Sequence, residues 1–171
     1  MKKFSFVTIV LLFFLFLSCA SGAVNNGPGL SLTEAIEESA KKTAREIPAG
    51  SLVAVLAFDS GSGALSEYII EELIGALIDN GIKVVDRKNL DHVYKEQNFQ
   101  MSGDVSDESA LSIGKFLGAS IAVTGQLTAF GDSYRYRISA LNVETASPVS
   151  ITRLDVRSDS NLRRMTEGGK K

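Results

Sequence analysis

The sequence predicts a single α/β domain with a mixed sheet, in which a parallel βαβ core is followed by an antiparallel meander and helices pack on the sheet. An apolar run, an amphipathic helical pattern and a second short apolar run predict the βαβ unit over residues 52–86. Three β-rich runs separated only by short turns predict the meander over residues 121–156.

The composition fits one globular domain and excludes several classes of site. The chain has 171 residues, of which 44% are hydrophobic and 22% charged. Its one cysteine and one histidine exclude an internal disulfide, a cysteine-based zinc cluster and a multi-histidine metal site. The 18 basic and 20 acidic residues are well mixed, so we expect no nucleic-acid partner.

Residues 1–18 have the pattern of a secretory signal peptide. Two lysines precede the apolar run 6–17, which is shorter than a membrane span of about 20 residues. Ser18 and Cys19 follow this run, and the arrangement resembles a bacterial lipobox. The resemblance implies cleavage before Cys19 and a lipid on its thiol. The alternative is an ordinary cleavage site among residues 20–23, with an incidental thiol.

Residues 19–31 are expected to form a lipid-anchored flexible tether. They lack periodicity and are rich in glycine, asparagine and serine. About a dozen such residues span about 20 Å on average. Because the mature chain is acidic, we expect the lipid rather than anionic head groups to hold it at the membrane.

The folded domain is expected over residues 32–157, and it begins with a helix. Ser31 and Glu34 have the spacing of a capping box, and Pro48 ends the helix after about Ile47.

The βαβ unit follows this first helix. Residues 52–58 are continuously apolar, which is typical of a strand buried on both faces. Residues 66–80 predict a helix that ends before Gly81, and residues 82–86 predict the second strand.

Two helices are expected before the meander. The first covers residues 90–97, and after a polar connection over 99–106 the second covers 107–117 and ends at Gly118. The expected buried stripe of the second helix consists of Ala110, Leu111, Ile113, Phe116 and Leu117.

The meander and the end of the chain complete the domain. Strands are expected over 121–129, 134–143 and 149–156, with turns at 130–133 and 145–148. Residues 158–171 are expected to be a C-terminal tail, either a frayed helix or disordered.

Four segments of the chain resemble motifs of one lipoprotein superfamily, in the expected order. They are VVDRKNL at 84–90, KEQNFQMSG at 95–103, IGKFLGA at 113–119 and VTG at 123–125. The chain is similar here to the CsgG/LpoB-type superfamily, which includes curli assembly components and activators of penicillin-binding proteins. The structural reading of these motifs places Gly118 at a helix end and Gly125 at a close approach or a bulge.

The resemblance implies a non-catalytic lipoprotein of the cell envelope, anchored in the outer membrane and facing the periplasm. One branch of the superfamily forms secretion pores with added transmembrane hairpins, and two hairpins need about 40 residues. No connection between the expected elements is that long, which disfavours a pore. The branch that binds a partner enzyme needs only an anchor, a tether and a domain. The short tether disfavours activation across the periplasm and favours a partner in the same membrane or a soluble one.

Two segments are candidate functional sites. Asp59, Ser60, Gly61, Ser62 and Gly63 follow a buried strand and precede a helix, where phosphate-binding loops lie, but a flexible turn is the favoured explanation. Tyr134, Arg135, Tyr136 and Arg137 alternate, so both tyrosines share one face of a strand and both arginines the other. Tyrosine and arginine are enriched at protein interfaces, which makes this segment a candidate docking patch; cross-strand packing is the alternative.

Two further groups have weaker patterns. His92 has acidic neighbours but no nucleophile at a meaningful spacing, so we expect a solvated or interface histidine. Asp104, Asp107 and Glu108 depart from the spacing of a calcium loop, and an acidic helix start accounts for the last two. We expect no metal site and no cofactor.

The leading hypothesis is therefore a lipoprotein that binds and regulates another envelope protein, with a peptidoglycan synthase as the sharpest version. The first alternative is a subunit of a lipoprotein secretion or assembly complex that forms homo-oligomers. The second is a small ligand-binding enzyme that uses the loop at Asp59–Gly63.

Overall fold

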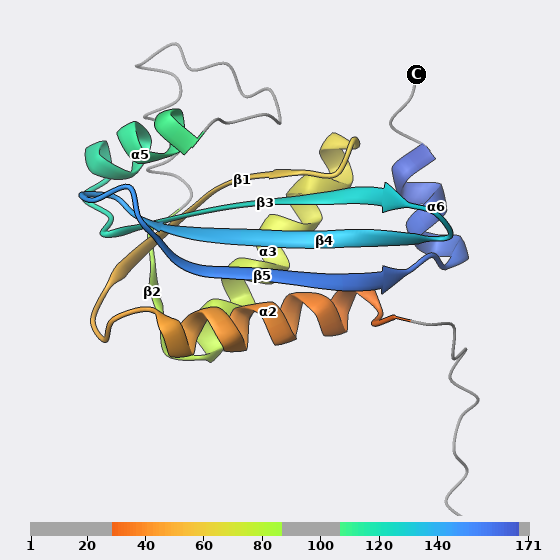
Figure 1. The fold of residues 1–171 in the computed structure, drawn as a ribbon, viewed down its shortest axis with the longest axis horizontal. Helices are drawn as coiled ribbons and strands as arrows, with labels where there is room; N and C mark the ends of the chain where they lie inside the picture. Colours follow the sequence, from red (N-terminus) through yellow and green to blue (C-terminus); the bar gives the residue numbers. More distant parts are fainter. Residues whose placement is uncertain (1–28, 87–106, 168–171) are drawn as a thin grey trace, which may run out of the picture.

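A computed structural model describes residues 29–86 and 107–167 of the chain (Figure 1). They form one five-stranded sheet in the order β2-β1-β3-β4-β5. The strands are β1 (Leu52–Asp59), β2 (Lys83–Val84), β3 (Ile121–Phe130), β4 (Ser133–Asn142) and β5 (Pro148–Arg157). Strands β2, β1 and β3 are parallel, whereas β3, β4 and β5 are antiparallel. The mixed sheet predicted from the sequence is confirmed.

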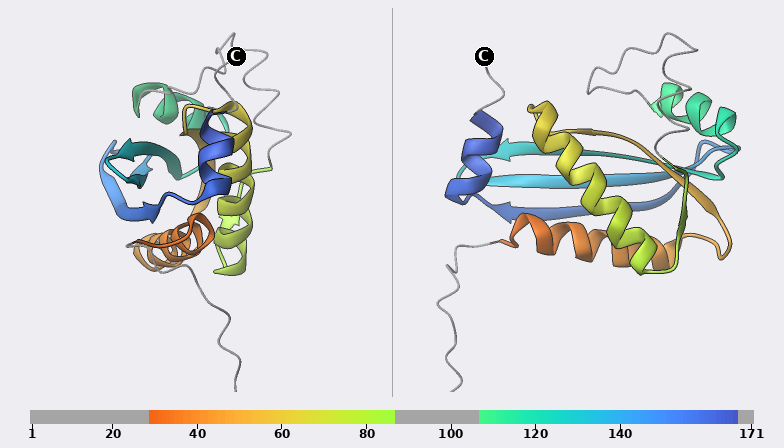
Figure 2. Two further views of the ribbon diagram at one scale, coloured as in Figure 1. Left: turned by 90° about the vertical axis from the view of Figure 1, so that its right-hand side faces the viewer. Right: turned by 180° about the vertical axis from the view of Figure 1, so that it is seen from behind.

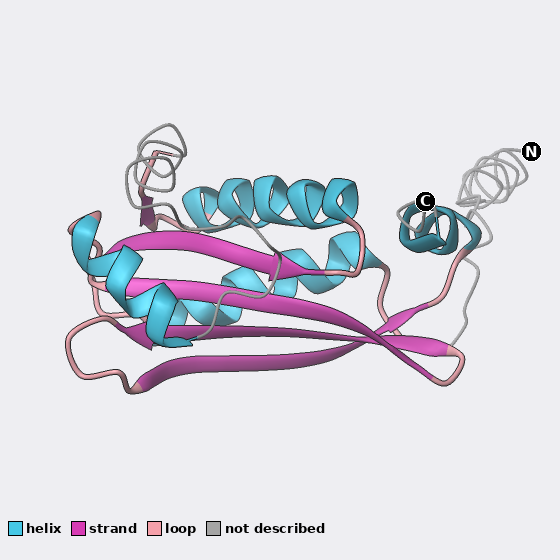
Figure 3. Ribbon diagram, turned by 90° about the horizontal axis from the view of Figure 1, so that it is seen from above, coloured by secondary structure: helices cyan, strands magenta, loops and turns pink. Residues whose placement is uncertain are grey.

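Within residues 29–86 and 107–167, four helices surround the sheet unequally. They are α2 (Leu32–Glu46), α3 (Gly63–Asp79), α5 (Asp107–Phe116) and α6 (Ser160–Glu167). Figure 2 shows α2, α3 and α6 gathered on one side, with α5 apart from them. Figure 3 shows α5 over one end of the long strands. The other end of that face carries no helix within the described part of the chain.

The start of α2 has the predicted capping box. The Ser31 backbone N–H donates to Glu34 Oε2 at 2.7 Å, and the Glu34 N–H donates to Ser31 Oγ at 3.2 Å. The Ser31 hydroxyl also donates to Glu34 Oε2 at 2.7 Å. The two hydrogen bonds that Ser31 donates to this carboxylate, with the Arg157 guanidinium 3.5 Å from Oε2, lower the pKa of the Glu34 carboxyl. The helix ends at Glu46, just before Pro48, as expected.

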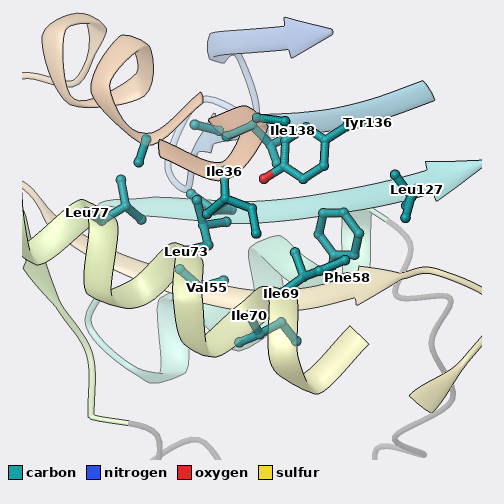
Figure 4. Close-up of a cluster of buried hydrophobic side chains, with 14 of the residues drawn as sticks. Ile36, Val55, Phe58, Ile69, Ile70, Leu73, Leu77, Leu127, Tyr136 and Ile138 are labelled. Atoms are coloured by element: carbon teal, nitrogen blue, oxygen red, sulfur yellow. The ribbon is translucent and has the colours of Figure 1, made fainter. Parts of the chain in front are cut away.

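The larger core lies between the sheet and α2 and α3. Phe58, Ile69, Leu73 and Tyr136 are each at most 2% exposed and pack together (Figure 4). The rings of Phe58 and Tyr136 lie 5.4 Å apart between centroids. A Cβ atom on Gly125 would lie 2.5 Å from the Phe58 ring, so only glycine fits beneath it. The close approach expected at Gly125 is confirmed.

A smaller core joins α5 to the opposite face of the sheet. Ala110 and Ile113 of α5 pack against Ala54, Leu56 and Val143. The helix ends with Gly118 at φ +67°, which agrees with the sequence.

The buried stripe predicted for α5 is partly wrong. Ala110 and Ile113 are buried, but Phe116 is 57% exposed. The stripe is narrower than predicted because the small residue Ala122 and the side chain of Val143 meet α5 closely. A Cβ atom on Gly114 would lie only 2.9 Å from Val143 Cγ2.

Both ends of the described chain join the fold. Leu30 lies beside β5, where its N–H donates to the Asp155 carbonyl and its carbonyl accepts from the Arg157 N–H, both at 2.9 Å. Near the C-terminus, α6 buries Leu162 in the larger core, with 3% of that residue exposed. Of the two alternatives for the segment after residue 158, the structure therefore has a helix, and it is packed.

Two element boundaries differ from those predicted. Helix α3 begins at Gly63 rather than Ser66, because Leu65 is buried and the Ser66 N–H bonds the Ser62 carbonyl at 2.9 Å. Strand β2 has two residues instead of five, since β1 is its single neighbour and the chain then leaves the edge of the sheet. The predicted helix at 90–97 and the connection at 99–106 lie outside the described residues.

Within the described ranges, no helix combines the length and apolar composition needed to cross a membrane.

Candidate functional site

The loop after β1 is held by its own polar groups. Asp59 Oδ1 accepts from the Gly61 N–H at 2.9 Å, and Gly61 has φ +72°. The hydroxyls of Ser60 and Ser66 are hydrogen-bonded at 2.9 Å, and Ser60 Oγ also donates to the Ser62 carbonyl at 2.9 Å. These bonds account for the residue types at 59–63 without a ligand, which supports the interpretation as a turn.

Tyr136 belongs to the core and is removed from the candidate docking patch. Its side chain is fully buried, and its hydroxyl lies 3.2 Å from Ser39 Oγ on α2. Burial raises the pKa of this phenol well above its ordinary value, although the hydrogen bond to Ser39 opposes the shift. The neighbouring Tyr134 is half-buried, with its hydroxyl 3.0 Å from Thr166 Oγ1 on α6. The predicted alternation is correct, and the tyrosine face is the buried one.

The arginines of β4 lie on the opposite, accessible face. In Figure 1 the strands lie in front of α3, so this face points toward the viewer. Arg135 Nε donates to Asp155 Oδ1 at 2.6 Å. Its guanidinium also stacks over the Phe130 ring, 4.7 Å from the centroid. Phe130 is 61% exposed.

A single row of residues crosses four strands on this face. Asp59 of β1 pairs with Gln126 of β3, Gln126 pairs with Arg137 of β4, and Arg137 pairs with Arg153 of β5. The Nε atom of Arg137 is buried and has no hydrogen-bond partner. The sheet therefore places the start of the loop at Asp59 and the arginines of β4 in one cross-strand row.

We call the accessible surface formed by these side chains the arginine face, and it consists of Gln126, Phe130, Arg135, Arg137 and Arg153. The alternating pattern of residues 134–137 predicts Arg135 and Arg137 as surface candidates but does not indicate the other three. The alternation of residues 148–157 places Arg153 and Asp155 on one face of a strand. That pattern could have indicated Arg153, whereas its pairing with Arg137 depends on the strand register.

A groove on the helical side of the molecule is acidic. This groove of about 200 Å³ between α2 and α3 is lined by Glu37, Glu71, Glu72 and Asp79, together with small and apolar residues. The domain therefore has an acidic groove between α2 and α3 and a group of arginines on its sheet.

The remaining candidates are placed as follows. Cys19, His92 and Asp104 lie outside the described residues, and Asp107 and Glu108 begin α5. No group of three or more histidine, cysteine, aspartate or glutamate residues within ranges 29–86 and 107–167 could hold a metal ion.

Solved structures with a similar fold were found. The LpoB C-terminal domain from Salmonella enterica matches with a TM-score of 0.65 and 16% identity, covering 75% of this chain and 100% of that one. The LpoB C-terminal domain from Escherichia coli matches with a TM-score of 0.65 and 17% identity, over the same shares. Lipoprotein GNA1162 from Neisseria meningitidis matches with a TM-score of 0.52 and 15% identity, covering 67% of this chain and 84% of that one. At these identities the likeness shows the fold.

A search of curated proteins finds no match. A family model, by contrast, matches residues 37–137, which is more than half of the chain. Its description is curli production assembly/transport component CsgG. The matched range runs from α2 into β4 and so includes both the parallel core and the first hairpin of the meander. The chain belongs to the CsgG family.

Proposed function

We propose that this protein is a non-catalytic lipoprotein of the cell envelope that binds and regulates a peptidoglycan synthase. One observation carries the proposal: the similarity to the LpoB C-terminal domains extends over 100% of those domains. At 16–17% identity the likeness concerns the fold, so the regulatory role is proposed by analogy with those domains. The resemblance of the sequence to activators of penicillin-binding proteins names the class of partner.

The proposal includes a lipid anchor at Cys19 in the outer membrane, with the domain facing the periplasm. Support comes from the signal-like residues 1–18 and the small residue Ser18 before Cys19. In this proposal the domain regulates rather than catalyses, and the loop at Asp59–Gly63 supports this part, since its hydroxyls and carboxylate hold the shape of the loop itself.

A second candidate is a subunit of a secretion or assembly complex, and the description of the family model favours it. In this case several copies would form the working unit. The two candidates differ in oligomeric state. A strictly monomeric species by light scattering in detergent argues against the assembly subunit, and a closed ring of copies argues against the regulator.

The regulator is tested by reconstitution. The full chain is extracted in detergent and added to a purified penicillin-binding protein of the same envelope, and the rate of glycan-strand synthesis is measured. We expect the rate to change severalfold and to saturate at one lipoprotein per enzyme. The Cys19→Ala form is the matched control, since it lacks the anchor but keeps the domain and should act equally in detergent. No change in rate with any synthase of that envelope contradicts the proposal.

A further inference from the structure

We propose that the arginine face binds a carboxylate-rich segment of the partner protein, with Arg137 and Arg153 as the two residues that hold the carboxylates. The proposal rests on the proposed function for the identity of the partner, and it adds the surface and its chemistry.

The first observation is the pairing of two like charges. Arg137 and Arg153 are directly opposite each other on the antiparallel strands β4 and β5. Like charges in this position destabilise a sheet. Neither arginine forms an ion pair with an acidic side chain in the described part of the molecule. The folded chain thus keeps an uncompensated repulsion at this point.

The second observation is an unused hydrogen-bond donor. Arg137 Nε is buried and has no hydrogen-bond partner, which is uncommon for a polar atom removed from water. The two acidic groups nearest in the register are already engaged. Asp155 accepts from Arg135, and Asp59 accepts from the Gly61 N–H. Because this Nε is itself shielded from solvent, an acceptor from outside the domain would bond it only after the half-buried Arg137 side chain turned outward.

The geometry fits carboxylates. Neighbouring strands lie about 4.8 Å apart, so the guanidinium groups of Arg137 and Arg153 can reach one carboxylate or two adjacent ones. A guanidinium presents its N–H groups as a fork that matches the two carboxylate oxygens. Beside them, the exposed Phe130 ring under Arg135 offers an apolar contact. Aromatic and arginine side chains are the groups that dominate binding energy at protein interfaces.

The mixed charge of the surroundings favours a protein segment over an anionic membrane. Asp59 lies in the same cross-strand row as the arginines, and the exposed Asp155 lies next to Arg135. A planar anionic surface would meet these carboxylates together with the arginines. A protein segment can instead place its carboxylates only where the arginines are.

The test combines binding and stability of the full chain in detergent. Arg153→Glu replaces the repulsion between residues 153 and 137 with attraction. We expect this change to raise the melting temperature of the free protein and to weaken binding to the purified synthase by about tenfold or more. The matched control is Arg45→Glu on the exposed surface of α2, which makes the same charge change on the helical side and should leave affinity unchanged.

Arg153→Ala provides a second variant, with a smaller loss of affinity and a retained fold verified by its melting curve. Unchanged affinity in both variants overturns the proposal that the arginine face binds the partner. If the synthase is still activated in that case, the proposed function remains intact. If no synthase binds, the proposed function fails, and a glutamate-rich synthetic peptide becomes the probe for the face. If the natural chain binds this peptide and Arg153→Glu does not, the result supports the arginine face as a carboxylate-binding surface. If the natural chain does not bind the peptide, the proposal is overturned.

Two other occupants give distinct results. The acidic groove between α2 and α3 could receive the arginine face of a second copy. Self-association that Arg153→Glu abolishes, without any effect on the peptide or the synthase, overturns the proposal in favour of that contact. Binding of the Cys19→Ala form to phosphatidylglycerol vesicles, with no binding to the peptide, overturns it in favour of a membrane.

Discussion

At the scale of single residues, the alternating sequence of β4 predicts which side chains share a face of the strand, but it does not predict which face is buried. Alternation shows that Tyr134 and Tyr136 share a face and that Arg135 and Arg137 share the other. It does not show which face the helices cover. That depends on where α2 and α3 pack, and Ser39 of α2 meets the Tyr136 hydroxyl across 97 positions of sequence. The residue pattern of a single strand cannot predict contacts between residues that are so far apart in the sequence.

Gly125 is a residue at which the sequence was sufficient. A glycine inside a β-branched strand predicts a close approach, and the Phe58 ring occupies the space of a Cβ atom. We expect Gly125→Ala to lower the free energy of unfolding by about 1–3 kcal/mol through overpacking. Urea unfolding of Gly125→Ala, Phe58→Leu and the double variant is the measurement. The double variant should lose less than the sum of the single losses, and simple additivity would show that the ring is not the cause.

The capping box predicts a dependence of stability on pH. The pKa of Glu34 lies below its ordinary value of 4.5 in the folded chain, because hydrogen bonds from Ser31 and then Arg157 favour the carboxylate. The stabilisation is therefore complete above pH 4.5 and is lost as the pH falls through the folded pKa. Melting temperatures of the natural chain and Glu34→Gln should differ most at neutral pH and converge in acid. A gap that is constant with pH would show that the charge of Glu34 makes no contribution.

At the scale of elements, the strands and helices with strong periodicity were predicted and the ends of the chain were not. The apolar run of β1 and the turns of the meander specify their own structure, since burial on both faces and short turns leave few alternatives. Helix α6 has few apolar residues, and its packing depends on a single one, Leu162. Leu30 joins β5 through two backbone hydrogen bonds, which no side-chain pattern reveals.

Helix α6 provides the test at this scale. We expect Leu162→Ala to lower the free energy of unfolding by about 2–5 kcal/mol, because the side chain fills part of the larger core. The exposed Met165 on the same helix is the control, and Met165→Ala should cost far less. Thermal or urea unfolding decides between a packed helix and a tail, since equal and small losses in both variants would show that α6 contributes no packing.

At the scale of the whole molecule, the sheet separates the acidic groove between α2 and α3 from the arginine face, and the described chain begins beside β5. Because Leu30 is bonded to β5, the tether expected from the sequence is shortened to the residues between Cys19 and Gly29. About ten residues of flexible chain span about 17 Å on average. We therefore expect a partner whose docking segment lies near the anchoring membrane.

The anchor is tested by mass and by fractionation. The natural protein extracted from membranes should carry the mass of acyl chains on a chain that begins at Cys19. Cys19→Ala should lack this mass and leave the membrane fraction, with the melting temperature of the domain unchanged. If the natural protein is unmodified and found in the soluble fraction, the prediction of a lipid anchor at Cys19 is wrong.

Site-specific photo-crosslinking in living cells tests most directly the claim that this domain is a protein-binding module. A photoreactive phenylalanine derivative replaces the exposed Phe130 of the full lipoprotein, and the same derivative at Arg45 on the helical side is the control. We predict a crosslinked product at position 130 that mass spectrometry identifies as a peptidoglycan synthase, with none at position 45. Products that contain only further copies of this chain, or no product above that at position 45, would contradict it.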